Sequence, residues 1–213
     1  MPLSTFGQNA TLDEIYNLAA GTFPAVEVYH SLHSADPGLT GTNELSGGSP
    51  AYARKQNTYP ASASGTLQNN TAILFDVPAG DVVGWGIWDA VTAGNCYQTG
   101  WFSISSGLAV VRTADATAND VQSVVHALAA NDRVVFEVVE GLSVPAGLTA
   151  GTLYYVISTG LTTDAFRVST TQAGAAVDIT GTGSVIWRKV AVTTFGGQGQ
   201  FQINAGDFDA FGN

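Results

Sequence analysis

The sequence predicts a mainly β protein, with an antiparallel β-sandwich or jelly-roll-like body, one short N-terminal helix and one small inserted β domain. Three observations lead to this prediction. Short segments rich in β-branched and aromatic residues recur along the 213 residues, and Gly, Asn, Asp and Pro separate them. Only one segment convincingly follows the 3.6-residue period of an amphipathic helix. The chain also contains 25 glycines, which suit frequent turns.

The predicted helix covers residues 11–20 (TLDEIYNLAA). Thr11 and Glu14 have the capping-box spacing, and Gly21 is placed to end the helix. The apolar face of this helix carries Leu12, Ile15, Tyr16 and Ala19. A single amphipathic helix beside a β-rich body must bury this face against a sheet or against another subunit.

The strands of the body are predicted after this helix, at residues 26–32, 51–59, 72–77, 82–88 and 97–104. In the fourth of these segments large and small residues alternate, which places Trp85 and Ile87 on one face of a strand. Short strands spaced by turn residues are typical of an antiparallel sandwich or a jelly roll.

A long motif lies between the first two predicted strands. It reads DPG at residues 36–38 and TNELSGGSPAYARK at residues 42–55. It is accompanied by ILFDVPAG at residues 73–80, GIWDA at 86–90 and TFGGQGQF at 194–201. Together these segments resemble a family of small virion structural proteins of tailed bacteriophages, described as tail-fibre or minor structural proteins. The resemblance implies a non-enzymatic virion component that acts by protein–protein assembly.

Extra material separates Gly100-Trp101-Phe102 from the closing segment, where simpler members of that family are shorter. Strands are predicted in it at residues 131–140, 152–158, 165–169, 176–180 and 184–190. Residues 145–156 (PAGLTAGTLYYV) and 166–169 (FRVS) resemble a small β-module of phage tail and fibre proteins. We therefore expect a body at residues 1–104, an inserted β module at 105–190, and a closing strand with a tail at 191–213. Residues 115–130 are compatible with either a helix or an extended strand.

The composition excludes several classes of protein. Charged residues make up only 11% of the chain and the net charge is −10. The seven basic residues are scattered, so no nucleic-acid-binding surface is expected. Cys96 is the one cysteine, which rules out an intrachain disulfide and a Cys-based zinc site. No signal peptide and no apolar stretch of about 18 residues is visible, so we expect no membrane insertion and synthesis in the host cytoplasm.

Candidate chemical groups do not form a recognisable site. His30, His33 and Asp36 have a spacing that suggests metal ligands, but we expect surface or strand-end histidines. The acidic residues Asp115, Asp120, Asp207 and Asp209, with Asn213, lack the spacing of a calcium loop. No carboxylate pair is singled out for glycoside hydrolysis among Glu44, Asp76, Asp89, Glu137 and Glu140, and no G-x-S-x-G motif is present. We expect no catalytic, cofactor-binding or metal-binding residues.

Binding surfaces are the remaining expectation. We predict an assembly interface that includes Leu12, Ile15, Tyr16, Phe23 and Tyr52. The partners implied by the resemblance are other virion proteins (tail or major capsid protein), together with further copies of the chain in a homo-oligomer such as a trimer. The protein would then be located in the virion, in a tail fibre, tail tip or capsid decoration. An alternative is a carbohydrate- or receptor-binding module for host adsorption, with Trp187 as an exposed aromatic that contacts a host glycan.

Overall fold

The computed structural model describes residues 28–60, 66–111, 119–139 and 142–211. The chain divides into two compact units: unit 1 contains residues 1–100 and 194–213, and unit 2 contains residues 101–193. The described residues form strands, turns and loops, and no helix among them is long and apolar enough to cross a membrane. The prediction of a mainly β protein is confirmed. The predicted helix at residues 11–20, with Leu12, Ile15 and Tyr16, lies outside the described residues, as does Phe23.

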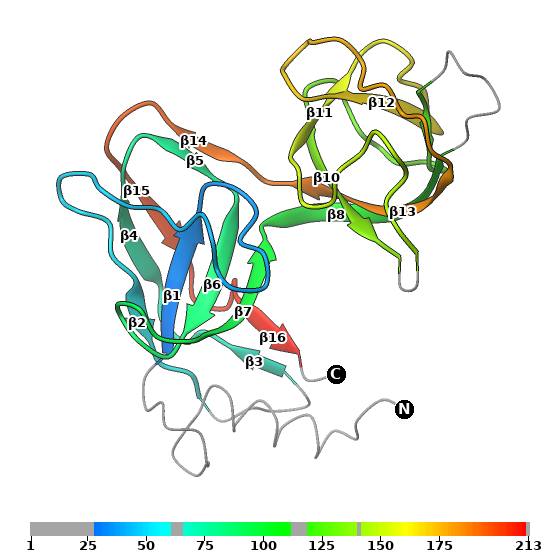
Figure 1. Cartoon of the computed structure of the whole chain (residues 1–213). Helices are drawn as coiled ribbons and strands as arrows, with labels where there is room; N and C mark the ends of the chain where they lie inside the picture. The colour runs from blue at the N-terminus through cyan, green and yellow to red at the C-terminus, as the bar shows by residue number, and fades with distance from the viewer. Residues whose placement is uncertain (1–27, 61–65, 112–118, 140–141, 212–213) are drawn as a thin grey trace. The chain divides into compact units, whose positions relative to one another are not determined.

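Unit 1 is built from one larger sheet and three strand pairs (Figure 1). The larger sheet has the order β2-β1-β6-β7, and the pairs are β4–β15, β5–β14 and β3–β16. The bounds are β1 Val28–His33, β2 Lys55–Asn57, β3 Thr66–Gln68, β4 Ile73–Val77, β5 Gly80–Val82, β6 Gly84–Trp88, β7 Cys96–Trp101, β14 Thr193–Phe195, β15 Gly199–Ile203 and β16 Asp209–Phe211. Each of the three pairs therefore joins a strand that precedes the barrel to one that follows it, whereas the larger sheet contains only strands that precede it.

The core of unit 1 follows from the alternation of its strands. In β4, Ile73, Phe75 and Val77 are buried while Leu74 between them is exposed, as the period of two requires. The predicted strand at residues 82–88 is divided between β5 and β6, with the buried Val83 at the break. In β6, Ile87 is fully buried and Trp85 is half-buried.

Gly86 in β6 is required by close packing. A Cβ atom at this position would lie 2.5 Å from the hydroxyl oxygen of Ser31 and 2.9 Å from Nε2 of His33. Both side chains belong to β1, and Ser31 of β1 faces Gly86 of β6 in the antiparallel register. The glycine therefore leaves the room that two polar side chains of β1 occupy.

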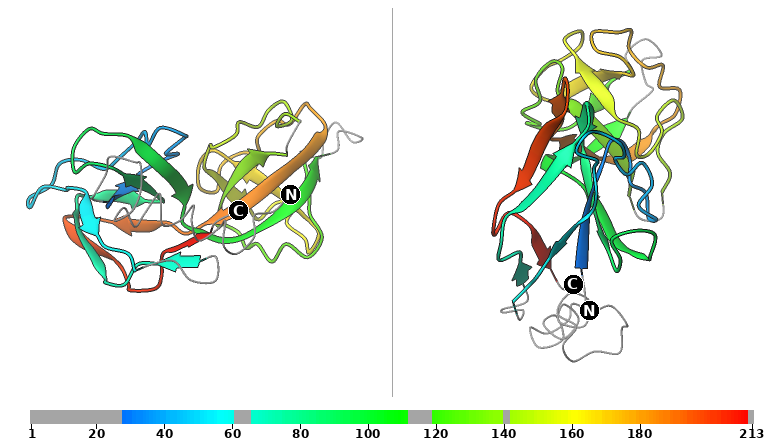
Figure 2. Two further views of the ribbon diagram at one scale, coloured as in Figure 1. Left: turned by 90° about the horizontal axis from the view of Figure 1, so that it is seen from below. Right: turned by 90° about the vertical axis from the view of Figure 1, so that its left-hand side faces the viewer.

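Unit 2 is a closed barrel with the strand order β10-β11-β12-β9-β8-β13 (Figures 1 and 2). The bounds are β8 Ser103–Val111, β9 Val121–Gln122, β10 Arg133–Val138, β11 Tyr154–Ile157, β12 Ala165–Ser169 and β13 Gly183–Val190. Its interior is apolar and contains Ala109, Val111, Val121, Leu128, Val134, Phe136, Leu148, Tyr154, Val156, Phe166, Val168, Ile179, Val185 and Trp187. Since every strand is paired on both sides, the barrel has no free sheet edge.

Two expectations for this part of the chain differ from the structure. Residues 176–180 form no strand, although the Val177 N–H donates to the Val168 carbonyl at 2.8 Å and the Ile179 N–H donates to the Asn119 side chain at 2.9 Å. The described residues 119–130 form β9 and turns, so the helical alternative is wrong there. Val121 is buried while Val124 is exposed, which the alternation of an extended segment explains.

Candidate functional site

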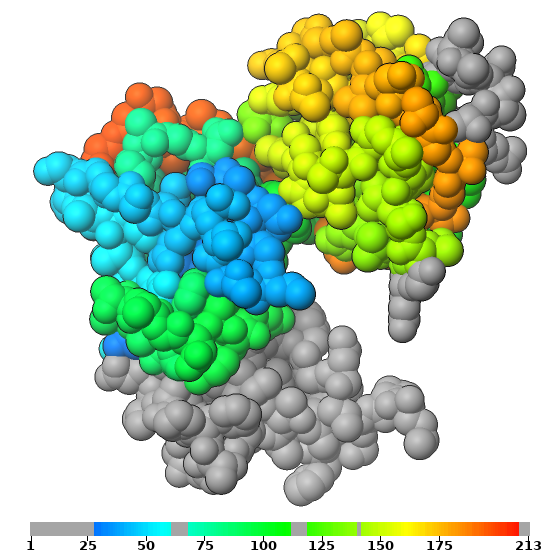
Figure 3. All heavy atoms as spheres, in the orientation of Figure 1, coloured from blue at the N-terminus to red at the C-terminus, as the bar shows by residue number. Residues whose placement is uncertain are grey.

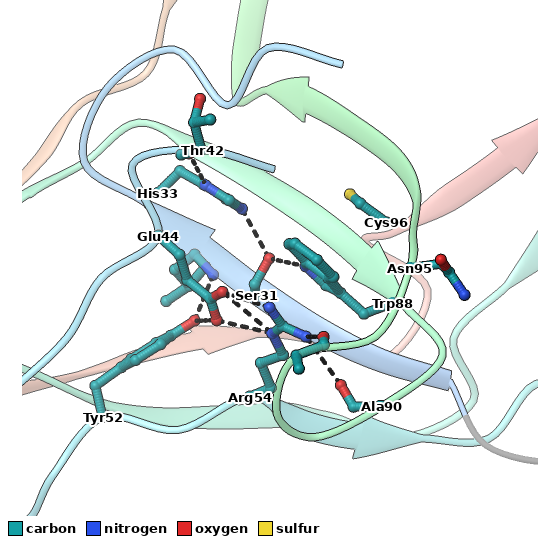
Figure 4. Close-up of polar contacts among 12 residues, drawn as sticks. Ser31, His33, Thr42, Glu44, Tyr52, Arg54, Trp88, Ala90, Asn95 and Cys96 are labelled. Carbon is teal, nitrogen blue, oxygen red and sulfur yellow. Dashed lines mark hydrogen bonds and ion pairs between the residues drawn. The ribbon is translucent and has the colours of Figure 1, made fainter. Parts of the chain in front are cut away.

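Three polar residues of the motif lie in one polar cluster of unit 1 (Figure 4). We call it the Arg54 cluster, and it consists of Ser31, His33, Glu44, Tyr52, Arg54 and Trp88. Strands β1 and β6 supply three of these residues, and the connection between β1 and β2 supplies the other three. This connection occupies much of the visible surface of unit 1, as the blue and cyan spheres of Figure 3 show.

Arg54 uses nearly all of its hydrogen-bonding capacity inside the unit. Its guanidinium forms a two-pronged ion pair with Glu44, with Nε–Oε1 at 3.0 Å and Nη2–Oε2 at 2.7 Å. Nη1 donates to the carbonyl oxygens of Ala90 and Ala93 at 3.0 and 2.6 Å. The group also lies over the Trp88 ring, 3.4 Å from its centroid. Only a planar, five-donor arginine can make this set of contacts, so Arg54 joins the motif to the loop after β6.

Both the hydroxyl and the ring of Tyr52 make contacts. Its hydroxyl oxygen accepts the Leu32 N–H at 2.7 Å and its proton points to Oε1 of Glu44 at 3.4 Å. Its ring stacks on Phe75 with a centroid separation of 6.1 Å. Burial raises the pKa of Tyr52 above its ordinary value, so the phenol stays protonated. These contacts lie within unit 1, and the role of Tyr52 at an assembly interface stays a prediction.

His33 belongs to a buried chain of hydrogen bonds. Trp88 Nε1 donates to the Ser31 hydroxyl at 2.8 Å, and this hydroxyl is 2.7 Å from Nε2 of His33. Nδ1 of His33 lies 2.6 Å from the Thr42 carbonyl, which can only accept, so Nδ1 carries the proton and Nε2 accepts from Ser31. Burial lowers the pKa of His33, which favours this neutral form.

The contact between Ser31 and His33 has the length of a nucleophile–base hydrogen bond, but its surroundings do not suit catalysis. Both side chains are fully buried, so no substrate reaches the hydroxyl. The other ring nitrogen of His33 is bound to a backbone carbonyl, where a catalytic histidine has a carboxylate. The chain of bonds from Trp88 to Thr42 therefore orders the interior of unit 1.

His30 is also fully buried, so the expectation of surface histidines is wrong for both residues, although His33 does end β1. Nε2 of His30 is 2.5 Å from the Tyr59 hydroxyl, and the ring meets Phe208 edge-on at 5.0 Å. Burial lowers the pKa of His30 to about 3. Asp36 lies in the following loop, where its carboxylate accepts the Gly38 N–H at 2.9 Å. Within the described ranges, no three His, Cys, Asp or Glu side chains gather as they would around a metal ion.

Most of the other carboxylates considered in the sequence form ion pairs or hydrogen bonds with side chains of the same unit. Those in ion pairs are Asp120 with Arg167, Glu137 with Arg188 and Asp76 with Lys55. Asp89 accepts from Asn95, and Asp207 accepts from Asn204. Asp115, Glu140 and Asn213 lie outside the described residues. Asp76, Asp89, Asp120, Glu137 and Asp207 thus each bind another side chain of the protein.

The prediction that Trp187 is exposed is wrong. It was expected to be exposed because Arg188 and Lys189 follow it, yet its side chain is only 3% exposed and lies in the barrel interior. Its indole N–H donates to the Ser123 hydroxyl at 2.9 Å, and its ring meets Phe166 edge-on. The strand alternation of β13 points Trp187 inward, so a stacked sugar ring cannot reach it.

A pocket of about 320 Å³ opens beside the Arg54 cluster, between residues 44–54 and residues 91–93. The charges that line it, Glu44 and Arg54, neutralise each other. The ion pair that organises this region was not predicted from the sequence. Two signals could have indicated it: a basic residue is rare in this chain, and Arg54 and Glu44 are two of the four charged residues of one motif.

Comparison with known families gives a match that includes this cluster. The family model described as "Podophage GP4 fiber I protein gp80" matches residues 2–135, which is more than half of the chain. A search of curated proteins gives no significant match. The family match confirms the resemblance to phage tail-fibre proteins and supports placement in a virion. The chain thus belongs to the Podophage GP4 fiber I protein gp80 family of phage fibre structural proteins.

Proposed function

We propose that this protein is a non-enzymatic component of a phage fibre or tail tip that acts by binding other virion proteins and further copies of itself. The observation that carries the proposal is that the polar side chains of the Arg54 cluster bind one another and the backbone inside unit 1. The motif that resembles tail-fibre proteins supplies Glu44, Tyr52 and Arg54, and their side chains tie loops together inside unit 1.

Catalysis needs groups that are both reactive and reachable. In the described residues, the Ser31–His33 pair is fully buried, and Glu44 is neutralised by Arg54. Protein–protein contact, in contrast, needs only a stable framework with exposed side chains. A low content of charged residues favours surfaces that neighbours cover.

The alternative function, binding of a host glycan, was based on Trp187. Because Trp187 lies inside the barrel, this residue gives the alternative no support. Assembly is therefore the function that we propose.

The test is detection of the protein in purified virions. Phage grown with a tagged copy of the gene should carry the tag at the fibre or tail tip when particles are labelled with gold-conjugated antibody. Phage that lack the gene should lack fibre density in electron micrographs. Particles that assemble with full fibres and carry no tagged protein would contradict the proposal.

A further inference from the structure

His126 is a buried histidine of unit 2 whose two ring nitrogens both bind the backbone. The residue is only 5% exposed. Its Nδ1 accepts the Leu128 N–H at 3.0 Å, and its Nε2 lies 3.3 Å from the Ala165 carbonyl oxygen. Because Nδ1 accepts a hydrogen bond, the neutral ring carries its proton on Nε2, which donates to Ala165. The Phe166 ring meets the imidazole edge-on at 5.1 Å, so the imidazole lies against the apolar interior of the barrel.

These contacts hold a short irregular segment, residues 124–128, which we call the His126 segment. It follows β9 and forms no strand. Val125 and Ala127, the two neighbours of His126, have φ +50° and +52°, a left-handed conformation that residues other than glycine rarely adopt. Such a conformation persists only where surrounding contacts hold it. The loss of one of these contacts therefore favours a change of conformation.

The contacts of the His126 segment join it to the turn before β12 and to the barrel interior. The Val125 N–H donates to the Asp164 carboxylate at 2.9 Å, and the His126 N–H donates to the Thr163 carbonyl at 3.3 Å. Val125 is 69% exposed, whereas the Leu128 side chain is 8% exposed and packs in the interior. The hydrogen bond from Leu128 to the ring of His126 thus fixes the turn through which the chain returns to the interior.

A second proton on the ring is incompatible with this arrangement. An imidazolium ring has an N–H group on both nitrogens. The Nδ1–H group would then face the Leu128 N–H across 3.0 Å, and neither group can accept. The cation would also be buried beside Phe166, which is unfavourable for a charge without a partner. Opening of the His126 segment removes both penalties, because it exposes the ring to water.

The charged groups around the His126 segment offer little stabilisation to a cation. None of the described ion pairs includes His126. The Asp164 carboxylate is exposed to water, which screens its charge. Strand β8 has no ionisable residue. The charged side chains of the other neighbouring strands and turns bind one another, in the ion pairs Asp132–Lys189 and Asp120–Arg167.

The other two histidines of the chain lack this constraint. Nε2 of His30 lies beside the Tyr59 hydroxyl, and Nε2 of His33 lies beside the Ser31 hydroxyl. A hydroxyl group can accept as well as donate, so it can adapt to a protonated ring, which a backbone N–H cannot. Protonation of His126, in contrast, must break a hydrogen bond of the backbone.

We infer that protonation of His126 releases the His126 segment from the barrel, so that this segment is an acid-sensitive switch that uncovers Leu128. Histidine is the side chain whose charge ordinarily changes between pH 5 and 8. The closed segment holds the neutral ring, so its stability is greatest at neutral pH and falls as the open form takes up the proton. Release would add Leu128 to the already exposed Val124 and Val125, which enlarges the apolar surface in acid. The inference goes beyond the proposed function and does not depend on it.

The experiment measures amide hydrogen exchange of the full chain by mass spectrometry at pH 7 and pH 5, with labelling times scaled for the intrinsic effect of pH on exchange. In wild type, the protection of the peptide that contains Leu128 should fall at least tenfold at pH 5, while peptides from β10 and β13 keep theirs. The matched control is His126→Asn, whose side-chain oxygen can accept the N–H of residue 128, as in an Asx turn, and does not titrate. Its protection should be the same at both pH values.

A second measurement observes the ring and the amide in wild type, and so does not require a variant to fold. Nuclear magnetic resonance of protein labelled with nitrogen-15 in histidine and leucine should show the proton of His126 on Nε2 at pH 7. As the pH is lowered, the ring signals of His126 and the amide signal of Leu128 should change with the same midpoint.

A ring that stays neutral at pH 5, or a Leu128 amide that keeps its protection after the ring is protonated, would overturn the inference. Equal pH dependence in wild type and His126→Asn, or a loss of protection in all barrel peptides together, would also overturn it, since acid would then act elsewhere. Detection of the protein in virions is a separate readout, so the proposed function can fail or stand independently of this switch.

Discussion

Unit 1 and unit 2 differ in how their strands are paired and in which residues form their interiors. Unit 2 is a closed barrel, and its interior is almost entirely apolar. Unit 1 has only one four-stranded sheet and several two-stranded pairs, and its interior includes Arg54, His30 and His33. Two-stranded pairs are marginal by themselves. Buried polar contacts connect loops and strands where the sheets of unit 1 are small, whereas the barrel interior is mainly apolar and includes few polar contacts such as the Trp187–Ser123 hydrogen bond.

The largest effect is expected from the barrel interior. Trp187→Ala removes a buried ring and leaves the Ser123 hydroxyl without its donor, which should cost about 3–5 kcal/mol of unfolding free energy. Chemical denaturation followed by the near-ultraviolet circular dichroism of the aromatic residues would measure the loss. Trp187→Phe, which keeps most of the apolar volume, should cost less. Equal stability of Trp187→Ala and wild type would show that the interior is not closely packed.

The next effect concerns the polar cluster of unit 1. Arg54→Met removes both prongs of the ion pair and leaves Glu44 without its counter-charge, which should destabilise the protein by about 3 kcal/mol. Arg54→Lys should recover only part of this loss, because one ammonium cannot reach Glu44, Ala90 and Ala93 together. The double variant Arg54→Met with Glu44→Gln should be more stable than Arg54→Met alone. Thermal unfolding measures the melting temperatures of the three variants. Melting temperatures equal to that of wild type would show that the Arg54 cluster does not stabilise the protein.

Acid should weaken unit 1 through His30. Its folded pKa is about 3 against an ordinary value of 6.5, so between these values the unfolded chain binds the proton and the folded chain does not. Stability from His30 is therefore fully present above pH 6.5 and falls with pH toward 3, by about 1.4 kcal/mol per pH unit. The free energy of unfolding should show a steeper slope in wild type than in His30→Leu from pH 6.5 to 4. Parallel slopes would show that His30 is not neutral in the folded protein.

The smallest effect is expected at an exposed ion pair. Lys55 and Asp76 are 3.9 Å apart and both side chains are partly exposed, so Lys55→Ala should change the unfolding free energy by less than about 1 kcal/mol. The contrast with Arg54, whose side chain is nearly buried, makes this pair a control for the cluster. A melting temperature that hardly moves in Lys55→Ala, and falls in Arg54→Met, would confirm that burial separates the two.

Local sequence patterns predicted the strands whose residues alternate or are β-branched. They did not predict which strands pair when those strands are far apart in the sequence. Residues 165–169 were predicted as a strand and form β12 with the same bounds. Asp209–Phe211 was expected to be part of the tail that follows the closing strand, yet it forms β16 by pairing with β3, more than 100 residues earlier. The position of Trp187 could have been found from the alternation of β13, because Arg188 next to it must point the other way.

The Arg54 cluster illustrates the same limit at the level of a site. Glu44 and Arg54 lie in one motif, so their proximity was within reach of the sequence. Trp88 and the carbonyls of Ala90 and Ala93 come from β6 and the loop after it, and only the folded sheet brings them to the guanidinium. The buried state of His30 depends on Tyr59 and Phe208, which are also distant along the chain.

Because β14, β15 and β16 belong to unit 1 and follow the barrel in the sequence, the two units are completed in a fixed order during translation. These strands leave the ribosome after the barrel strands, and until then β5, β4 and β3 lack the strands with which they pair in the structure. The barrel, whose strands all lie between residues 103 and 190, has everything it needs earlier. A nascent chain therefore completes its second unit before its first, and a chain that stops between residues 190 and 193 contains every barrel strand but lacks β14, β15 and β16 of unit 1.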